Sequence, residues 1–166
     1  MPDAFVMTSS AFLFVPAGIA GWRQQTPVFV ALFGGALFST LYHAYDEQRF
    51  EMLDVVWASF SVVAALLVWL AGWKRYGPTH WRSWVPIALG LAAMIIFFVK
   101  GSYEHTEDVE NRPDDYEVFH SMWHLLLAMA GSVLMWTAVD VRDAMVPVSQ
   151  LWNRPKKYKD MNVREP

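Results

Sequence analysis

Five runs of apolar residues constrain the fold of this chain more than any other feature, because each approaches the ~20 residues that cross ~30 Å of hydrocarbon. They cover residues 4–22, 28–45, 52–73, 84–99 and 116–139. The chain has 166 residues, of which 55% are hydrophobic and 17% charged, and a soluble domain of this size cannot bury so much apolar surface. The sequence therefore predicts an all-α, polytopic membrane helical bundle with five transmembrane helices, in which residues 1–141 form a single transmembrane unit.

Prolines and short connections refine this prediction. Pro27 opens the second run and Pro86 falls in the first turn of the fourth, where a missing N–H removes no helical hydrogen bond. Pro16 and Gly18 predict a kink near the end of the first run. The short connections between the first three runs favour antiparallel neighbours.

The distribution of charge predicts the orientation. With five spans, one side of the membrane carries the N-terminus and the loops that follow the second and fourth runs. Of the 13 Lys and Arg residues, three lie on that side and ten on the other, whereas 12 of the 16 acidic residues lie on the N-terminal side. Cytoplasmic loops are enriched in Lys and Arg. We therefore expect the N-terminus on the non-cytoplasmic side and a basic tail, residues 142–166, on the cytoplasmic, matrix or stromal side.

Composition excludes several classes of function. The chain has no Cys, which excludes disulfides, thiolate metal sites and a cysteine nucleophile. A net charge of −3 without a basic stripe argues against a nucleic-acid partner. Membrane lipids are the expected partners, and the basic tail fits contact with anionic head groups. Met1-Pro2-Asp3 lacks the basic segment of a secretory signal, so we expect the first run to be retained.

Five polar residues fall inside the spans at one depth. Ser39 and His43 lie four residues apart at the end of the second run, Asp54 begins the third, and His120 and His124 lie four apart at the start of the fifth. A spacing of four places both members of a pair on one helix face. All three helix ends lie on the N-terminal side of the predicted bundle, so these side chains are expected to meet there.

Three imidazoles with an open fourth position form a common catalytic zinc shell. We therefore predict that His43, His120 and His124 bind Zn²⁺. Asp54 is expected to accept a hydrogen bond from a zinc-activated water or to orient a ligand, and Ser39 to make a similar hydrogen bond or to stabilise an oxyanion. Simpler interpretations stay open: a chance pair of histidines, a Ser bonded to its own helix, and an Asp that caps a helix. His80 is interpreted as a solvated loop residue and His105 as an auxiliary or adventitious ligand.

The pattern resembles that of the CREST membrane hydrolase superfamily, which includes alkaline ceramidases, adiponectin receptors and the myomaker / transmembrane protein 8 group. The shared features are Ser39-x-x-x-His43, Asp54 eleven residues later, and His120-x-x-x-His124 in the last helix. The stretches 12–16, 42–46 and 115–121 look closest to the myomaker-like branch.

The resemblance implies zinc bound by the three histidines and hydrolysis of a lipid amide or acyl ester within the membrane. Members of that branch include a phospholipase that acts on glycolipid anchors and a fusion protein without a settled enzymatic role. The superfamily has seven spans where this chain has five, so two central helices are missing. Removing two helices keeps the zinc residues on one side of the membrane.

Three hypotheses follow. The first is a zinc-dependent integral-membrane lipid hydrolase. The second is a non-enzymatic accessory subunit of a larger membrane complex that retains the fold and a structural zinc site; the small residues Gly34, Gly35 and Ala36 favour close helix packing of this kind. The third is a haem or quinone protein that uses histidines as axial ligands.

Overall fold

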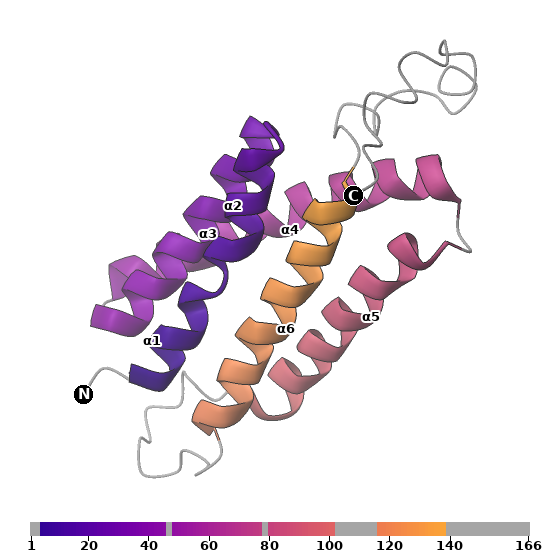
Figure 1. Ribbon diagram of the computed structural model, residues 1–166. Helices are drawn as coiled ribbons and strands as arrows, with labels where there is room; N and C mark the ends of the chain where they lie inside the picture. Colours follow the sequence, from indigo (N-terminus) through magenta and orange to yellow (C-terminus); the bar gives the residue numbers. More distant parts are fainter. Residues whose placement is uncertain (1–3, 46–47, 78–79, 102–115, 139–166) are drawn as a thin grey trace.

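The computed structural model describes residues 4–45, 48–77, 80–101 and 116–138, and this part of the chain is helical without strands (Figure 1). The helices in chain order are α1 (Ala4–Ala11), α2 (Phe14–Trp22), α3 (Thr26–Tyr45), α4 (Gln48–Tyr76), α5 (Trp81–Ile96), the π-helical turn η1 (Phe97–Gly101) and α6 (Tyr116–Thr137). His105 and the predicted tail lie outside the described residues.

Five helical segments are long and apolar enough to cross a membrane, which confirms the predicted fold class. They are Ala4–Trp22, Thr26–Tyr45, Arg49–Tyr76, Trp81–Val99 and Tyr116–Thr137. The third extends beyond the predicted 52–73 at both ends, because the polar residues that flank the apolar run continue the helix.

The first span is broken rather than kinked at its end. Backbone N–H groups of Phe12, Leu13 and Val15 donate to carbonyls three residues earlier instead of four, which separates α1 from α2. The predicted kink at Pro16 and Gly18 is therefore displaced toward the N-terminus. The reason is that a helical proline ring collides with the carbonyl four residues before it, and for Pro16 that carbonyl belongs to Phe12.

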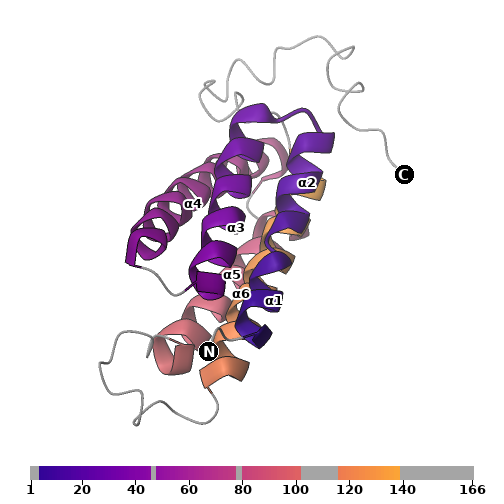
Figure 2. The same cartoon turned by 90° about the vertical axis from the view of Figure 1, so that its left-hand side faces the viewer.

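The helices form two antiparallel pairs joined by the first span. The pairs are α3 with α4 and α5 with α6, and α1 and α2 contact both α3 and α6. Figures 1 and 2 show α1 and α2 lying along these two helices, while α4 lies on the far side of α3. The apolar core between them holds Ala20, Val28, Val68, Leu134 and Met135.

Small residues bring α3 and α4 close together. A Cβ atom added at Gly34 would overlap the Trp57 ring, and one added at Gly35 would overlap the Ser61 hydroxyl. The Ser61 Oγ lies 2.9 Å from the Ala31 carbonyl across the gap and 2.9 Å from the Trp57 carbonyl of its own helix. These contacts agree with the close packing that the small-residue sequence favours.

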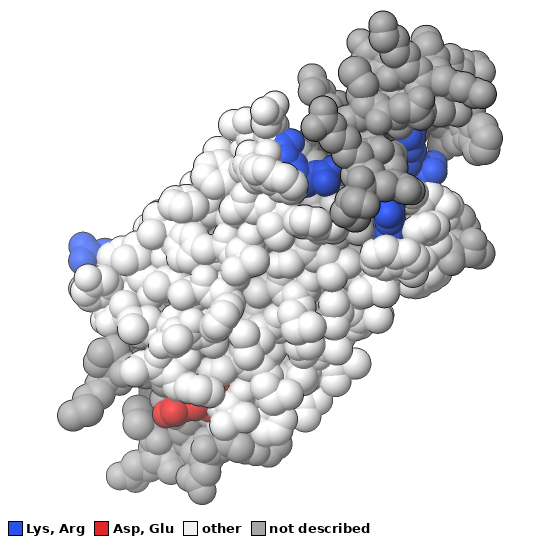
Figure 3. Space-filling model, in the orientation of Figure 1, with Lys and Arg blue, Asp and Glu red and all other residues white. Residues whose placement is uncertain are grey.

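Charged side chains are separated between the two ends of the bundle. In the view of Figure 3, most Lys and Arg side chains (blue) gather where α4 ends and α5 begins. The Asp and Glu side chains that are visible (red) lie at the opposite end. At the basic end, Arg23 donates to the carbonyls of Trp136 at 2.9 Å and Ala138 at 2.8 Å. These bonds satisfy carbonyl groups that the end of α6 leaves without helical partners.

His80 has a structural role that differs from the solvated loop residue predicted from the sequence. Its Nδ1 accepts from the Arg82 backbone N–H at 3.2 Å and caps α5. Its ring also stacks on Tyr76, with ring centroids 5.2 Å apart. The His80 side chain thus caps the start of α5 and packs against the end of α4.

Candidate metal centre

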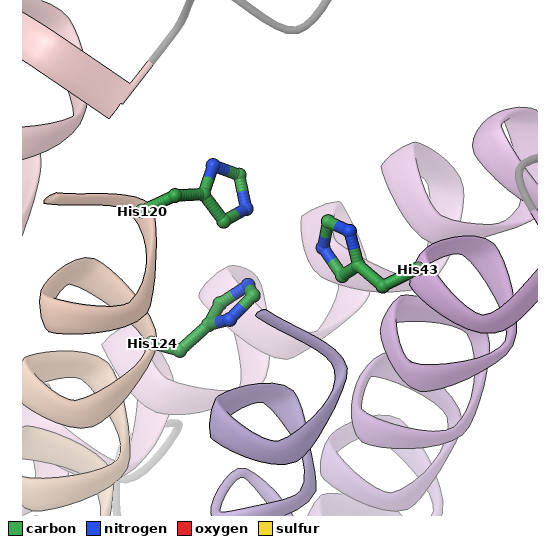
Figure 4. A group of neighbouring side chains, drawn as sticks. All are labelled: His43, His120 and His124. Atoms are coloured by element: carbon green, nitrogen blue, oxygen red, sulfur yellow. The ribbon is translucent and has the colours of Figure 1, made fainter. Parts of the chain in front are cut away.

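Three histidines from two helices converge at the acidic end of the bundle. His43 lies in the last turn of α3, and His120 and His124 lie in the first turns of α6. Ring centroids are 5.0 Å apart for His43 and His120, 5.2 Å for His43 and His124, and 4.7 Å for the pair on α6. Figure 4 shows the three rings facing one another across the interface. The spacing and the topology predicted from the sequence thus do bring these residues together.

The histidines are buried, which makes their closeness informative. His43 is 8% exposed, His120 1% and His124 fully buried. One nitrogen from each ring can be chosen so that the three atoms lie within 4.8 Å of one another. Buried polar groups are costly unless hydrogen-bonded or bound to a metal. The group could therefore hold a metal ion.

A hydroxyl group contacts one nitrogen of each histidine on α6. Ser9 Oγ, from α1, lies 3.0 Å from His124 Nδ1, and Tyr116 Oη lies 3.0 Å from His120 Nδ1. Both hydroxyl-bearing residues are buried. Histidines that bind metals commonly use their second ring nitrogen in such a hydrogen bond, which fixes the orientation of the ring.

The remaining nitrogen of His124 indicates whether a metal fits among the three histidines. Nε2 of His124 is buried and has no hydrogen-bond partner among the described residues. An unpartnered buried nitrogen needs an explanation, and an ion shared with His43 and His120 supplies one. The donor set, three imidazoles and no thiolate, suits a borderline transition metal.

Aromatic rings enclose one side of the cluster. Trp123 packs against His120 and His124 with centroid distances of 5.0 and 4.9 Å, and Phe97 of η1 packs on Trp123 at 4.5 Å. Such π-helical turns often occur at functional sites. The apolar rings keep water from this side of the histidines and lower the local dielectric constant, which strengthens electrostatic interactions within the site.

The two predicted catalytic residues lie on helices that reach this end. Ser39 is buried on α3, one turn before His43. Asp54 lies near the start of α4 and is half-buried. It is not one of the three residues whose ligand atoms cluster, and its predicted action through a water stays a prediction.

Sequence reasoning missed the two hydroxyl partners. Tyr116 lies four residues before His120, so the helical spacing that linked the two histidines could have pointed to it. Ser9 carried a weaker signal, a polar residue in an apolar run at the same predicted depth. Its contact with His124 spans 115 residues of sequence and depends on how the first span packs.

Comparison with known proteins places no relative beside this chain. No family model, curated protein sequence or solved structure matches it. The geometry and chemistry of the histidine cluster are therefore what indicates a function.

Proposed function

We propose that this protein is a zinc-dependent integral-membrane hydrolase that cuts a lipid amide or acyl ester, as a shortened relative of the myomaker-like branch of the CREST superfamily. The observation that carries the proposal is the buried cluster of His43, His120 and His124, whose ligand atoms lie within 4.8 Å of one another. Ionisable residues within membrane spans are rare and usually functional.

Zinc is the metal that this donor set favours. Three neutral imidazoles with an open fourth position are typical of catalytic zinc sites, and hard cations such as Mg²⁺ and Ca²⁺ require oxygen ligands instead. The haem hypothesis is less compatible with the geometry. Axial histidines approach a haem from opposite faces, whereas these three rings pack edge to face with centroids 4.7–5.2 Å apart, which leaves no space for a porphyrin between them.

In the proposed reaction, water adds to the carbonyl carbon of the lipid, and the bond from that carbon to the amide nitrogen or ester oxygen breaks. Zinc at such a site supplies the nucleophile by lowering the pKa of a water to ~7. Asp54 accepts the proton from the attacking water and returns it to the leaving nitrogen or oxygen. Ser39 donates a hydrogen bond to the carbonyl oxygen as negative charge develops on it.

The proposed orientation puts this chemistry on the non-cytoplasmic side. The cluster lies at the end of the bundle opposite the basic residues Arg23, Lys74, Arg75 and Arg82, and positively charged ends generally face the cytoplasm. The lipid substrate would then come from the non-cytoplasmic leaflet.

Metal content is the first test. The protein is purified with a tag that contains no histidine, and zinc is measured by mass spectrometry. We expect about one zinc per chain, its loss in His43→Ala and His120→Ala, and its retention in His80→Ala, which removes a histidine outside the cluster. A folded parent protein without zinc would overturn the proposal.

Activity is tested separately from metal binding. Fluorescent ceramide and phospholipid are offered in mixed micelles, and we expect hydrolysis by the parent protein. Asp54→Asn should retain zinc and lose activity by about 10²–10⁴-fold, the usual contribution of a general acid or base. Glu51→Gln removes a charge from the same helix, and this variant should retain both zinc and activity. Equal activity of the two variants would exclude the role assigned to Asp54.

A second candidate is an accessory subunit with a structural zinc site. The observation that favours it is the face of α4, where Val55, Val56, Phe60, Val62 and Leu66 are exposed. Another subunit could cover this surface as well as lipid could. Native electrophoresis distinguishes the candidates, because a subunit would migrate only in a larger complex and the isolated chain would turn over no lipid.

A further inference from the structure

The hydroxyl of Ser9 makes two hydrogen bonds but carries one proton. Its Oγ donates to the Val6 carbonyl of the same helix at 2.7 Å, and it lies 3.0 Å from His124 Nδ1. A carbonyl oxygen only accepts, and the Val6 carbonyl also accepts from the His124 ring; we place the single hydroxyl proton in the shorter of the two Ser9 bonds, that to Val6. The bond to His124 then requires that the proton lie on Nδ1 and that Ser9 Oγ accept it.

This hydrogen bond, together with the one that the Val6 carbonyl accepts from the same ring, favours one nitrogen of His124 as the metal ligand. In a neutral imidazole one nitrogen carries the proton and the other carries the lone pair. With the proton on Nδ1, the lone pair lies on Nε2, the buried atom that has no partner among the described residues. The opposite tautomer would place the proton on Nε2 and leave that atom no lone pair for a cation.

We propose that Ser9 is a positioning residue, which holds His124 in the Nδ1-protonated tautomer and so presents the Nε2 lone pair to the metal. The part of this inference that concerns metal affinity rests on the proposed zinc function. The part that concerns the tautomer does not, because the hydrogen bonds of Ser9 are present without an ion.

α1 carries Ser9 to His124. This helix ends at Ala11, and α1 and α2 both contact α6 (Figure 1). The contact also makes α1 part of the site, since Ser9 of the first span bonds to Nδ1 of His124. We therefore expect α1 to be more ordered when the metal is bound.

Ser10 provides a matched control on the same helix. It is also buried, and its Oγ also donates to a backbone carbonyl three residues earlier, that of Met7 at 2.7 Å. Its contact with another helix is to Thr40 at 3.2 Å rather than to a histidine. Ser9→Ala and Ser10→Ala should therefore disturb α1 to a similar extent, but only Ser9→Ala should change His124.

The tautomer is measured by ¹⁵N NMR of metal-free, histidine-labelled protein in micelles, under conditions that keep the imidazoles neutral. The His124 signals are assigned with His124→Gln. We expect a protonated Nδ1 in the parent, Ser10→Ala and Ser9→Thr proteins, and a shift toward protonated Nε2 in Ser9→Ala. An unchanged His124 spectrum in a folded Ser9→Ala protein would overturn the inference.

Zinc affinity is then measured by competition with a chromophoric chelator. We expect the dissociation constant to rise about 10–100-fold in Ser9→Ala, as for other residues that orient metal ligands, and to stay within about twofold in Ser10→Ala and Ser9→Thr. An equal rise of the dissociation constant in both alanine variants would show that Ser9 contributes only packing. If the parent protein binds no zinc, the proposed function fails, while the tautomer measurement still decides the role of Ser9.

Discussion

The Tyr116 hydroxyl is the second group that orients a histidine of the cluster. Tyr116 is fully buried at the start of α6, and its Oη lies 3.0 Å from His120 Nδ1. When His120 binds a metal through Nε2, its Nδ1–H donates to Tyr116. We therefore expect the hydroxyl to hold the ring in an orientation that makes Nε2 available to a metal.

Replacement of Tyr116 by Phe should weaken metal binding while the ring packing is retained. We expect the zinc dissociation constant to rise about 10-fold or more, measured by chelator competition. Tyr45→Phe serves as the control, because Tyr45 is exposed at the end of α3. A Tyr116→Phe protein with parental affinity would show that the hydrogen bond to His120 does not support the site.

Residue patterns predicted the cluster of three histidines but not the groups that contact it. The sequence could predict the cluster of His43, His120 and His124. The four-residue spacing is a local feature of the sequence, and the order of the helices determines which helix ends meet. The contacts of Ser9 and the close fit of Trp123 against the imidazoles depend on the rotation of each helix about its axis. That rotation is set by packing between distant residues, which a single sequence does not encode in a readable pattern.

At the scale of helices, close approach of α3 and α4 depends on glycine. The positions facing Gly34 and Gly35 are occupied by Trp57 and Ser61, so an added methyl group would overlap them. Because His43 lies two turns beyond these glycines on α3, the separation of the two helices also affects the position of the cluster.

Gly35→Ala should therefore destabilise the bundle although alanine is the better helix former. We expect a loss of about 1–3 kcal/mol, typical of overpacking, measured by unfolding in mixed micelles. Gly72→Ala on α4 is the control, because nothing lies within 4 Å of the added Cβ, and it should be neutral or slightly stabilising. Equal stability of the two variants would mean that α3 and α4 separate without cost.

The positions of α3 and α6 followed closely from the sequence, whereas the break in the first span did not. The prediction that Pro86 lies in the first turn of its helix was also wrong, because α5 begins at Trp81 and Pro86 lies inside it. Apolar length predicts where a helix crosses a bilayer, and Thr26–Tyr45 and Tyr116–Thr137 begin or end within two residues of the prediction at each boundary. The effect of Pro16 appears four residues earlier, at Phe12, because the proline ring acts on a preceding carbonyl. The sequence location of a proline is therefore a poor guide to where the helix breaks.

At the scale of the whole molecule, the separation of charge between the two ends predicts a single orientation. The absence of native cysteine allows this to be tested with one introduced thiol at a time. We expect Asn111→Cys to be labelled by an impermeant maleimide from the non-cytoplasmic side and Ser149→Cys only after the membrane is permeabilised. The reverse labelling pattern would put the histidine cluster on the cytoplasmic side.

The coordination of the metal tests the central claim most directly. X-ray absorption at the zinc edge, recorded on the purified parent protein, should show about three nitrogen ligands at ~2.0–2.1 Å with the pattern of imidazole rings, completed by oxygen. His43→Ala should lose one imidazole or the metal altogether. A folded protein with no stoichiometric zinc, or with zinc bound by oxygen ligands alone, would contradict a metal centre built from His43, His120 and His124.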